Sequence, residues 1–197
     1  MSDDETLRVY EARAQDYAAM GQDTDEDRAP FVAALPPGTG PVLDWGCGPG
    51  HDAAAFAALG LAVEATDATA AMVDLARAKG VAARQEMFEA LNPAPRYRGI
   101  WANFSLLHAA PGSLPDLIAL AAGALLPGGV LHVGMKRGQG AARDTIGRHY
   151  IYVEGADLDR LTAAHGLTRL SLRHGHAKGM DGRPAGYVIH LSRKAHA

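Results

Sequence analysis

The sequence is short of cysteine, of aromatic residues and of any surplus of one charge. Its 197 residues include one cysteine, Cys47, which cannot form a disulfide within the chain and is typical of a reducing cytoplasm, where we expect the protein. Lys and Arg number 19 against 22 Asp and Glu, so the net charge of -3 offers no basic surface for nucleic-acid phosphates. No apolar run is long enough to span a membrane, and the first residues lack a signal-peptide pattern. We therefore expect neither a nucleic acid nor a membrane as a partner.

What the chain does have is enough apolar sequence for one full core. Hydrophobic residues make up 48% of it, and residues 1–197 are predicted to form a single domain. Helix-like and strand-like segments alternate, which predicts an α/β fold. Residues 167–173 and 186–192 are predicted strands without a helix between them, so the last strand should run antiparallel. His174 and His176 have no cysteine or carboxylate at ligand spacing, so no metal site is predicted.

The stretch around which the chain is organised is residues 42–50, Val-Leu-Asp-Trp-Gly-Cys-Gly-Pro-Gly, followed by a helix-like run over residues 51–59. This order predicts a strand, a tight loop and a helix. Glycines at alternate positions permit positive φ and let a ligand approach the backbone, whose N–H groups suit an anionic or carboxylate-bearing ligand. The spacing is not the dinucleotide fingerprint, because the third glycine comes one residue early, and no Gly-Lys-Ser/Thr ending marks a Walker loop. An ordinary glycine-rich turn is the alternative.

With Asp44 ahead of the glycines, the run resembles motif I of the class I S-adenosylmethionine-dependent methyltransferases. Leu126-Pro127-Gly128-Gly129 before a predicted strand is similar to that family's Leu-x-Pro-Gly-Gly turn. The resemblance covers about residues 8–194 and is to the small-molecule branch, methyltransferase types 11 and 25, which is ubiquinone-biosynthesis-like. It implies a Rossmann-like α/β fold: a seven-stranded, mostly parallel sheet of order 3-2-1-4-5-7-6, with strand seven antiparallel and helices on both faces. It also implies that residues 1–35 form N-terminal cover helices and that the cofactor is S-adenosyl-L-methionine.

The N-terminal segment is expected to hold a helix over residues 5–20, a solvated loop over 21–30 and a short helix over 29–35. Tyr17 on the first helix resembles the tyrosines that pack over the cofactor in relatives. A helix that only docks on the sheet is the alternative.

The resemblance implies which residues hold the cofactor. Asp67, at the end of the second strand, would bind the ribose hydroxyls; a helix N-cap is the alternative. Met72 would pack on the ribose or adenine, or belong to the core. The adenine could be bound by the side chain of Glu86 or of Glu89, or by the backbone of the two residues between them. We favour the backbone. The predicted cofactor-binding residues are Tyr17, Asp44, Gly46, Cys47, Gly48, Gly50, Asp67, Ala68, Met72, Met87, Phe88 and Asn103.

The acceptor is expected at the carboxyl end of the fourth and fifth strands, where open α/β sheets bind ligands. His108 resembles a histidine that lies near the transferred methyl group in relatives, while a structural histidine is the alternative. The segment 136–152 is basic and loop-like; it could bind an acidic or phenolic substrate, or be a mobile solvated loop. His108 or His149 would take a proton from a hydroxyl acceptor. The candidate catalytic residues are His108, His149 and Tyr150.

These observations predict methyl transfer to an O, N, S or C nucleophile on a small molecule. The alternative is a non-catalytic S-adenosylmethionine-binding or regulatory protein on the same fold, because a fold does not fix a function. No residue indicates the acceptor's identity or the oligomeric state.

Overall fold

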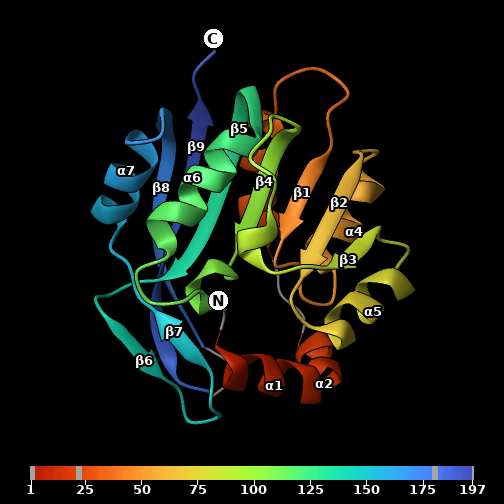
Figure 1. Ribbon diagram of the computed structural model, residues 1–197, viewed down its shortest axis with the longest axis vertical. Coiled ribbons are helices and arrows are strands. Elements are labelled where there is room, and N and C mark those ends of the chain that lie inside the picture. Colours follow the sequence, from red (N-terminus) through yellow and green to blue (C-terminus); the bar gives the residue numbers. More distant parts are fainter. Residues whose placement is uncertain (1–2, 21–23, 179–181, 197) are drawn as a thin grey trace.

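The computed structural model describes residues 3–20, 24–178 and 182–196, which form a central sheet with helices on both faces (Figure 1). The strands of this sheet are β1 (Val42–Trp45), β2 (Val63–Asp67), β3 (Ala83–Gln85), β4 (Tyr97–Asn103), β5 (Leu125–Lys136), β8 (Leu167–Lys178) and β9 (Pro184–Lys194). The helices are α1 (Asp4–Ala12), α2 (Ala14–Ala19), α3 (Asp25–Ala34), α4 (His51–Ala58), α5 (Ala70–Ala78), α6 (Leu114–Ala124) and α7 (Gly155–Ala163), with 3-10 turns η1 (Phe88–Ala90) and η2 (Leu106–His108).

The strand order is β3-β2-β1-β4-β5-β9-β8. Strands β3, β2, β1, β4 and β5 pair in parallel, whereas β9 is antiparallel to both β5 and β8. With β8 and β9 counted as the sixth and seventh strands, this is the predicted 3-2-1-4-5-7-6 order with a reversed seventh strand, so the predicted fold class is confirmed. The parallel strands all end at one edge, the lower one in Figure 1.

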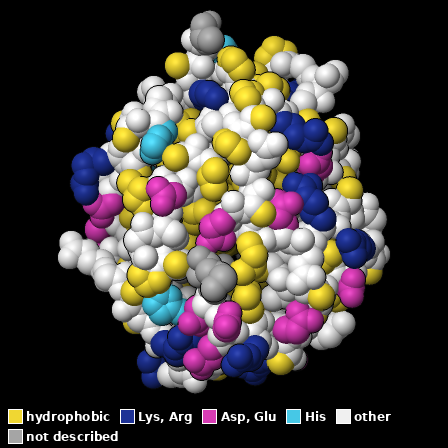
Figure 2. Space-filling view, in the orientation of Figure 1, with side chains coloured by type: hydrophobic (Ala, Val, Ile, Leu, Met, Phe, Trp, Pro, Cys, Tyr) yellow, Lys and Arg dark blue, Asp and Glu magenta, His cyan; other side chains and the backbone are white. Residues whose placement is uncertain are grey.

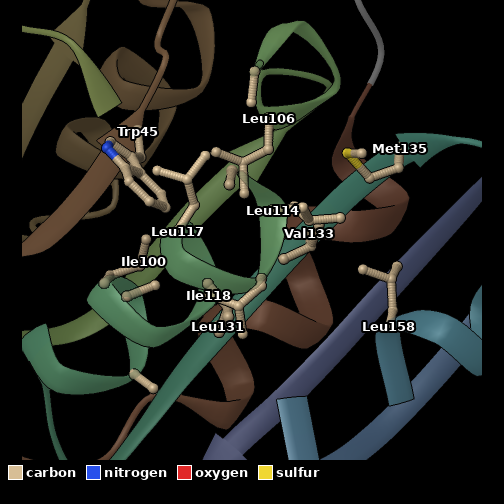
Figure 3. Close-up of a cluster of buried hydrophobic side chains, with 14 of the residues drawn as sticks. Trp45, Ile100, Leu106, Leu114, Leu117, Ile118, Leu131, Val133, Met135 and Leu158 are labelled. Atoms are coloured by element: carbon tan, nitrogen blue, oxygen red, sulfur yellow. The ribbon is translucent and has the colours of Figure 1, made fainter. Parts of the chain in front are cut away.

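The two faces of the sheet are buried under different helices because successive side chains of a strand point to opposite sides. Ile100 and Ala102 of β4 belong to the large cluster beneath α6 and α7, much of which is seen in Figure 3. Trp101, between them, lies on the other face with Phe31 of α3 and Phe56 of α4. Every strand residue of β1 is buried, as expected for a strand covered on both faces.

The segment after β5 differs from the predicted loop. β6 (Ala141–Arg143) and β7 (His149–Ile151) pair as an antiparallel two-stranded sheet. Asp144 organises its turn: one carboxylate oxygen accepts hydrogen bonds from the N–H groups of Ile146 and Arg148 at 3.1 and 2.9 Å. The prediction of a loop missed this hairpin because each of its strands is only three residues long.

The N-terminal segment also differs in detail. The helix expected over residues 5–20 is divided at Arg13 into α1 and α2, which lie across the carboxyl edge of the sheet (Figure 1). α3 starts at Asp25, so residues 25–30 are helical rather than a loop; three carboxylates in its first turn favour this start. The fully buried Phe31 makes α3 part of the core, and only its N-terminal end faces the region beneath α1 and α2.

In the part of the chain that the structure describes, no helix is both long and apolar enough to cross a membrane. On the face seen in Figure 2, acidic and basic side chains lie intermingled rather than in an extended patch of one sign.

Candidate functional site

Two adjoining cavities lie at the carboxyl edge of the parallel strands, beneath α1 and α2. The first follows the glycine loop, and the second extends toward the ends of β5, β7 and the β8–β9 hairpin. Four aromatic side chains border both cavities and thus form their common wall: Tyr10, Tyr17, Phe104 and His108.

Ten of the predicted cofactor-binding residues come together around the first cavity, although they come from segments far apart in the sequence. Two others do not line it: Met87, which precedes η1, and Gly50. The ten are Tyr17, Asp44, Gly46, Cys47, Gly48, Asp67, Ala68, Met72, Phe88 and Asn103.

Gly46 and Gly48 have φ angles of 80° and 51°, a region that side chains rarely occupy. Among the described residues, a Cβ atom on Gly48 would meet nothing closer than Tyr17 Cε1 at 3.5 Å, so it would occupy space at the border of the cavity. A Cβ on Gly46 would instead lie 2.4 Å from the Cβ of Ser105. Gly48 is therefore the position where the missing side chain leaves room for a ligand. Burial raises the pKa of the neighbouring Cys47 thiol, which stays protonated.

Gly50 is glycine for a different reason. It is the N-cap of α4 with φ 77°, and a Cβ there would lie 2.7 Å from the Cβ of Ala76 on α5. The packing of α4 against α5 requires this glycine, which gives it a structural role. The expected contact of Gly50 with the cofactor stays a prediction.

Two acidic residues of the first cavity, Asp44 and Asp67, hold its backbone in place. Asp44 is 3% exposed and accepts a hydrogen bond at 3.0 Å from the N–H of Ala53 in α4; burial raises its pKa. Asp67 accepts from the N–H of Gly48 on one oxygen and from the N–H and hydroxyl of Thr69 on the other, each at 2.9 Å. Burial raises the pKa of Asp67 as well. Since a carboxylate has about four acceptor positions, roughly one remains on Asp67 for a ligand.

Asn103 offers an unused donor in the same cavity. Its Oδ1 accepts from Nε2 of His132 at 3.1 Å, and the His132 ring stacks on Trp101 with centroids 3.6 Å apart. Its Nδ2 is buried and has no hydrogen-bond partner among the described residues. A buried amide without a partner costs free energy, and a ligand acceptor in the cavity would supply that partner.

His108 is held by hydrogen bonds on both ring nitrogens. Nδ1 lies 2.8 Å from the carbonyl oxygen of His149, which can only accept, so Nδ1 carries the proton. Nε2 therefore accepts from the hydroxyl of Tyr10 at 2.7 Å, and that hydroxyl accepts from Arg148 at 2.9 Å. Burial lowers the pKa of His108 to about 3. His108 is therefore neutral, and its one lone pair accepts the hydrogen bond from Tyr10. Its role as a base stays a prediction.

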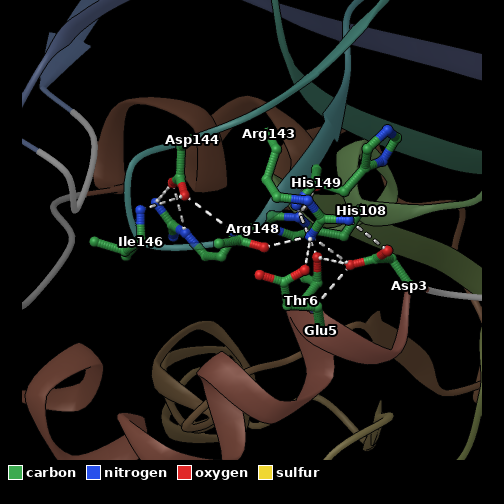
Figure 4. A network of polar contacts seen from close by, with 10 residues as sticks. Asp3, Glu5, Thr6, His108, Arg143, Asp144, Ile146, Arg148 and His149 are labelled. Carbon is green, nitrogen blue, oxygen red and sulfur yellow. Dashed lines mark hydrogen bonds and ion pairs between the residues drawn. The ribbon is translucent and has the colours of Figure 1, made fainter.

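His149 and Tyr150 take different positions. His149 borders neither cavity; its N–H donates to the hydroxyl of Thr6 at 2.8 Å and joins β7 to α1 (Figure 4). This placement gives no support to its predicted role as a base. Tyr150 lines the second cavity, where the ammonium nitrogen of Lys136 lies 3.6 Å from the centroid of its ring.

Several residues at the two cavities had no distinguishing signal in the sequence. They include Ser105 and His51 in the first and Arg173 and Tyr187 in the second. Asp52 also borders the first cavity, where it accepts hydrogen bonds from the indole of Trp101 and from Arg28. Within residues 3–20, 24–178 and 182–196 no three His, Cys, Asp or Glu side chains are grouped as metal ligands.

Residues 42–129 match the family model of a methyltransferase domain. In this match and in its seven-stranded sheet, the chain is similar to the class I S-adenosylmethionine-dependent methyltransferases. A search of curated proteins gives no match to the chain.

Solved structures, methyltransferases among them, share the fold of this chain. The CcbJ methyltransferase from Streptomyces caelestis is 22% identical, with a TM-score of 0.75 over 98% of this chain and 100% of its own. A 1,6-didemethyltoxoflavin-N1-methyltransferase from Burkholderia thailandensis, solved with 1,6-didemethyltoxoflavin and S-adenosylhomocysteine, is 23% identical, with a TM-score of 0.68 over 99% of this chain and 91% of its own. The [4+2]-cyclase SpnF is 18% identical, with a TM-score of 0.73 over 97% of this chain and 95% of its own.

Proposed function

We propose that the protein transfers a methyl group from S-adenosylmethionine to a small-molecule acceptor. The observation that carries this proposal is the pair of adjoining cavities, one along the methyltransferase glycine loop and one beyond a shared aromatic wall. The toxoflavin enzyme, solved with S-adenosylhomocysteine and its small substrate, has the same fold.

The residues of the first cavity fit this cofactor. The space left by Gly48 admits a ligand close to the backbone, and the unused Nδ2 donor of Asn103 suits an oxygen of the ligand. Asp67 has roughly one acceptor position for a ribose hydroxyl. Tyr17, Met72 and Phe88 supply apolar surface around it. When bound, the cofactor supplies a methyl group on a positively charged sulfur.

Loading requires movement of the cover. The first cavity is about 100 Å³, below the roughly 300–1,000 Å³ of small-molecule sites. α1 spans the cavities: the carboxylate of Glu11 accepts from the N–H of Ala71 on α5 at 3.2 Å, and the hydroxyl of Thr6 bonds β7. We therefore assign α1 and α2 as the cover of a single domain over residues 1–197, one that opens for the cofactor and closes over it.

The residues of the common wall orient the acceptor rather than exchange protons with it. His108 is neutral and accepts a hydrogen bond from Tyr10, so the Tyr10 and His108 rings are fixed at the boundary between the two cavities. Rigid aromatic walls position two reactants and exclude water, and such positioning provides a large share of the rate in a reaction between them.

Binding and turnover test the proposal separately. Titration with S-adenosylhomocysteine should show binding by the parent protein and a loss of affinity in Gly48→Val and in Asp67→Ala, with folding checked by circular dichroism. For the Asp67 charge-assisted hydrogen bond we expect a loss of about 1.5–3 kcal/mol. A mass-spectrometric screen with methyl-labelled S-adenosylmethionine should then identify methylated acceptors. Binding without any product from a broad acceptor panel would favour the non-catalytic alternative, and no binding would refute the cofactor assignment.

A further inference from the structure

The second cavity contains a buried guanidinium with unused hydrogen-bond donors. The side chains of Arg148 and Asp144 are 3% and 5% exposed, and Arg148 lines the cavity. Asp144 Oδ2 accepts from Nε and Nη2 of Arg148 at 3.0 and 2.8 Å, and Tyr10 accepts from Nη1. A guanidinium has five N–H groups, so two of those on Arg148 have no partner within the described part of the chain. The ion pair with Asp144 fixes the plane in which they point.

A second cation lies on the same wall. The ammonium of Lys136 is 3.6 Å from the Tyr150 ring centroid, and the Arg148 guanidinium carbon is 5.1 Å from the same centroid. The Tyr150 hydroxyl remains protonated, because burial raises its pKa. Both cations are thus gathered around one neutral ring beside the shared wall formed by Tyr10 and His108.

The acidic residues of this cavity are engaged elsewhere. Among the described residues, its carboxylates are those of Glu26 and Asp27 on α3. Arg173 of β8 contacts both: its Nη2 lies 2.6 and 2.7 Å from the two Asp27 oxygens, and its Nη1 lies 3.4 Å from Glu26. The carboxylates of Glu26 and Asp27 are thus held at the Arg173 end of the cavity, away from the two donors of Arg148 that have no described partner.

We propose that the second cavity takes a small organic anion, with its oxyanion bound by the Arg148 guanidinium and the Lys136 ammonium. The cavity volume of about 340 Å³ is sufficient for a one-ring compound. A planar guanidinium binds a carboxylate or an acidic phenolate through parallel N–H groups, and the aromatic wall favours a flat molecule. This inference rests on the proposed function, for which it specifies the acceptor class.

The test uses three probes of equal shape and different charge: benzoate, benzamide and benzamidine. Each is titrated into the protein saturated with S-adenosylhomocysteine. Benzoate should bind at least about tenfold more tightly than benzamide, since one charge-assisted hydrogen bond is worth more than 1.4 kcal/mol, and benzamidine should bind most weakly. Lys136→Gln should lower the affinity for benzoate about tenfold and leave the affinity for benzamide unchanged. Lys136→Arg should retain the preference for benzoate over benzamide.

Lys178 provides the matched control, because it lines the same cavity further along the β8–β9 hairpin. Lys178 of β8 pairs with Pro184 at the start of β9, whereas Lys136 of β5 pairs with Tyr187, three residues further along β9. Lys178→Gln should lower benzoate affinity much less than Lys136→Gln does.

Equal affinity for benzoate and benzamide, no binding of benzoate at millimolar concentration, or equal losses in the two glutamine variants would overturn the anion site. Binding of S-adenosylhomocysteine itself is measured in the same titrations. If it binds while the charge preference is absent, this inference fails and the proposed function stands; if it does not bind, the proposed function fails.

Discussion

Alanine should mainly lower cofactor affinity at Gly48 and mainly lower stability at Gly50, although the two glycines stand two residues apart in one motif. Both have positive φ, so alanine at either position pays the cost of the left-handed backbone, about 1–2 kcal/mol. At Gly48 the new Cβ meets only Tyr17 Cε1 at 3.5 Å, an ordinary contact. At Gly50 it lies 2.7 Å from the Cβ and 2.9 Å from the Cα of Ala76, so α4 and α5 must separate. Overpacking of this kind costs a further 1–3 kcal/mol or so.

Gly60→Ala isolates the backbone cost. Gly60 has φ 79°, and a Cβ there would have no atom within 4 Å. Urea denaturation of the three variants should therefore rank Gly60→Ala and Gly48→Ala together, each destabilised by about 1–2 kcal/mol, and Gly50→Ala at about 2–5 kcal/mol. Titration with S-adenosylhomocysteine should give the other ranking: Gly48→Ala loses affinity, while folded Gly50→Ala and Gly60→Ala bind as the parent does.

Two outcomes would refute this reasoning. A Gly50→Ala protein as stable as Gly60→Ala would show that the α4–α5 contact yields without cost. A Gly48→Ala protein with parental affinity would show that the ligand does not approach the backbone at this loop.

Three further predictions concern charged and polar groups. His108→Ala and Tyr150→Phe should each lower kcat about tenfold or more and leave S-adenosylhomocysteine affinity within about 1 kcal/mol, since both act on the acceptor side; a loss of cofactor affinity with unchanged kcat would contradict this. Burial lowers the pKa of His132 to about 3, so below an unfolded pKa of about 6.5 the unfolded chain binds a proton that the folded protein does not. Each unit by which the pH is lowered below about 6.5 should therefore cost about 1.4 kcal/mol of stability from this residue. Between pH 7 and 5, the urea midpoint of His132→Gln should fall less steeply than that of the parent. The hydrogen bond from Arg143 holds the pKa of Asp3 well below its usual range. The contribution of this pair to stability is therefore complete above the unfolded pKa of about 3.9 and is lost as the pH falls through the lowered value. Asp3→Asn should cost less than about 1 kcal/mol of stability at pH 7, and this cost should shrink in acid and at high salt.

The sequence was most informative where a local pattern has one structural solution. Strand β1, the glycine loop and helix α4 lie where the motif predicts them, because the apolar strand, the positive-φ glycines and the helix are consecutive in the chain. The motif could not show that Gly48 leaves room for a ligand whereas Gly50 leaves room for a neighbouring helix. Gly48 and Gly50 have the same backbone requirement, and only the position of Ala76, on another helix, distinguishes them.

The hairpin of β6 and β7 and the start of α3 were missed for a related reason. Their stability depends on polar contacts that propensity does not register: the Asp144 carboxylate within the turn, and the contact between Asp27 and Arg173, which are 146 positions apart. His108 illustrates the same limit, because the hydrogen bonds that determine its tautomer come from Tyr10 and from the backbone of His149.

The sequence by itself determined the fold class, the strand order implied by the family resemblance, and the segments that meet at the carboxyl edge. These follow from hydrophobic periodicity, glycine spacing and the chain order of strands and helices, which are local properties. Only the tertiary structure decided the chemistry of the site: which donors on Asn103 and Arg148 have no partner among the described residues, and whether His108 carries a charge. Those properties depend on burial and on partners contributed by distant segments, and burial exists only once the chain has folded.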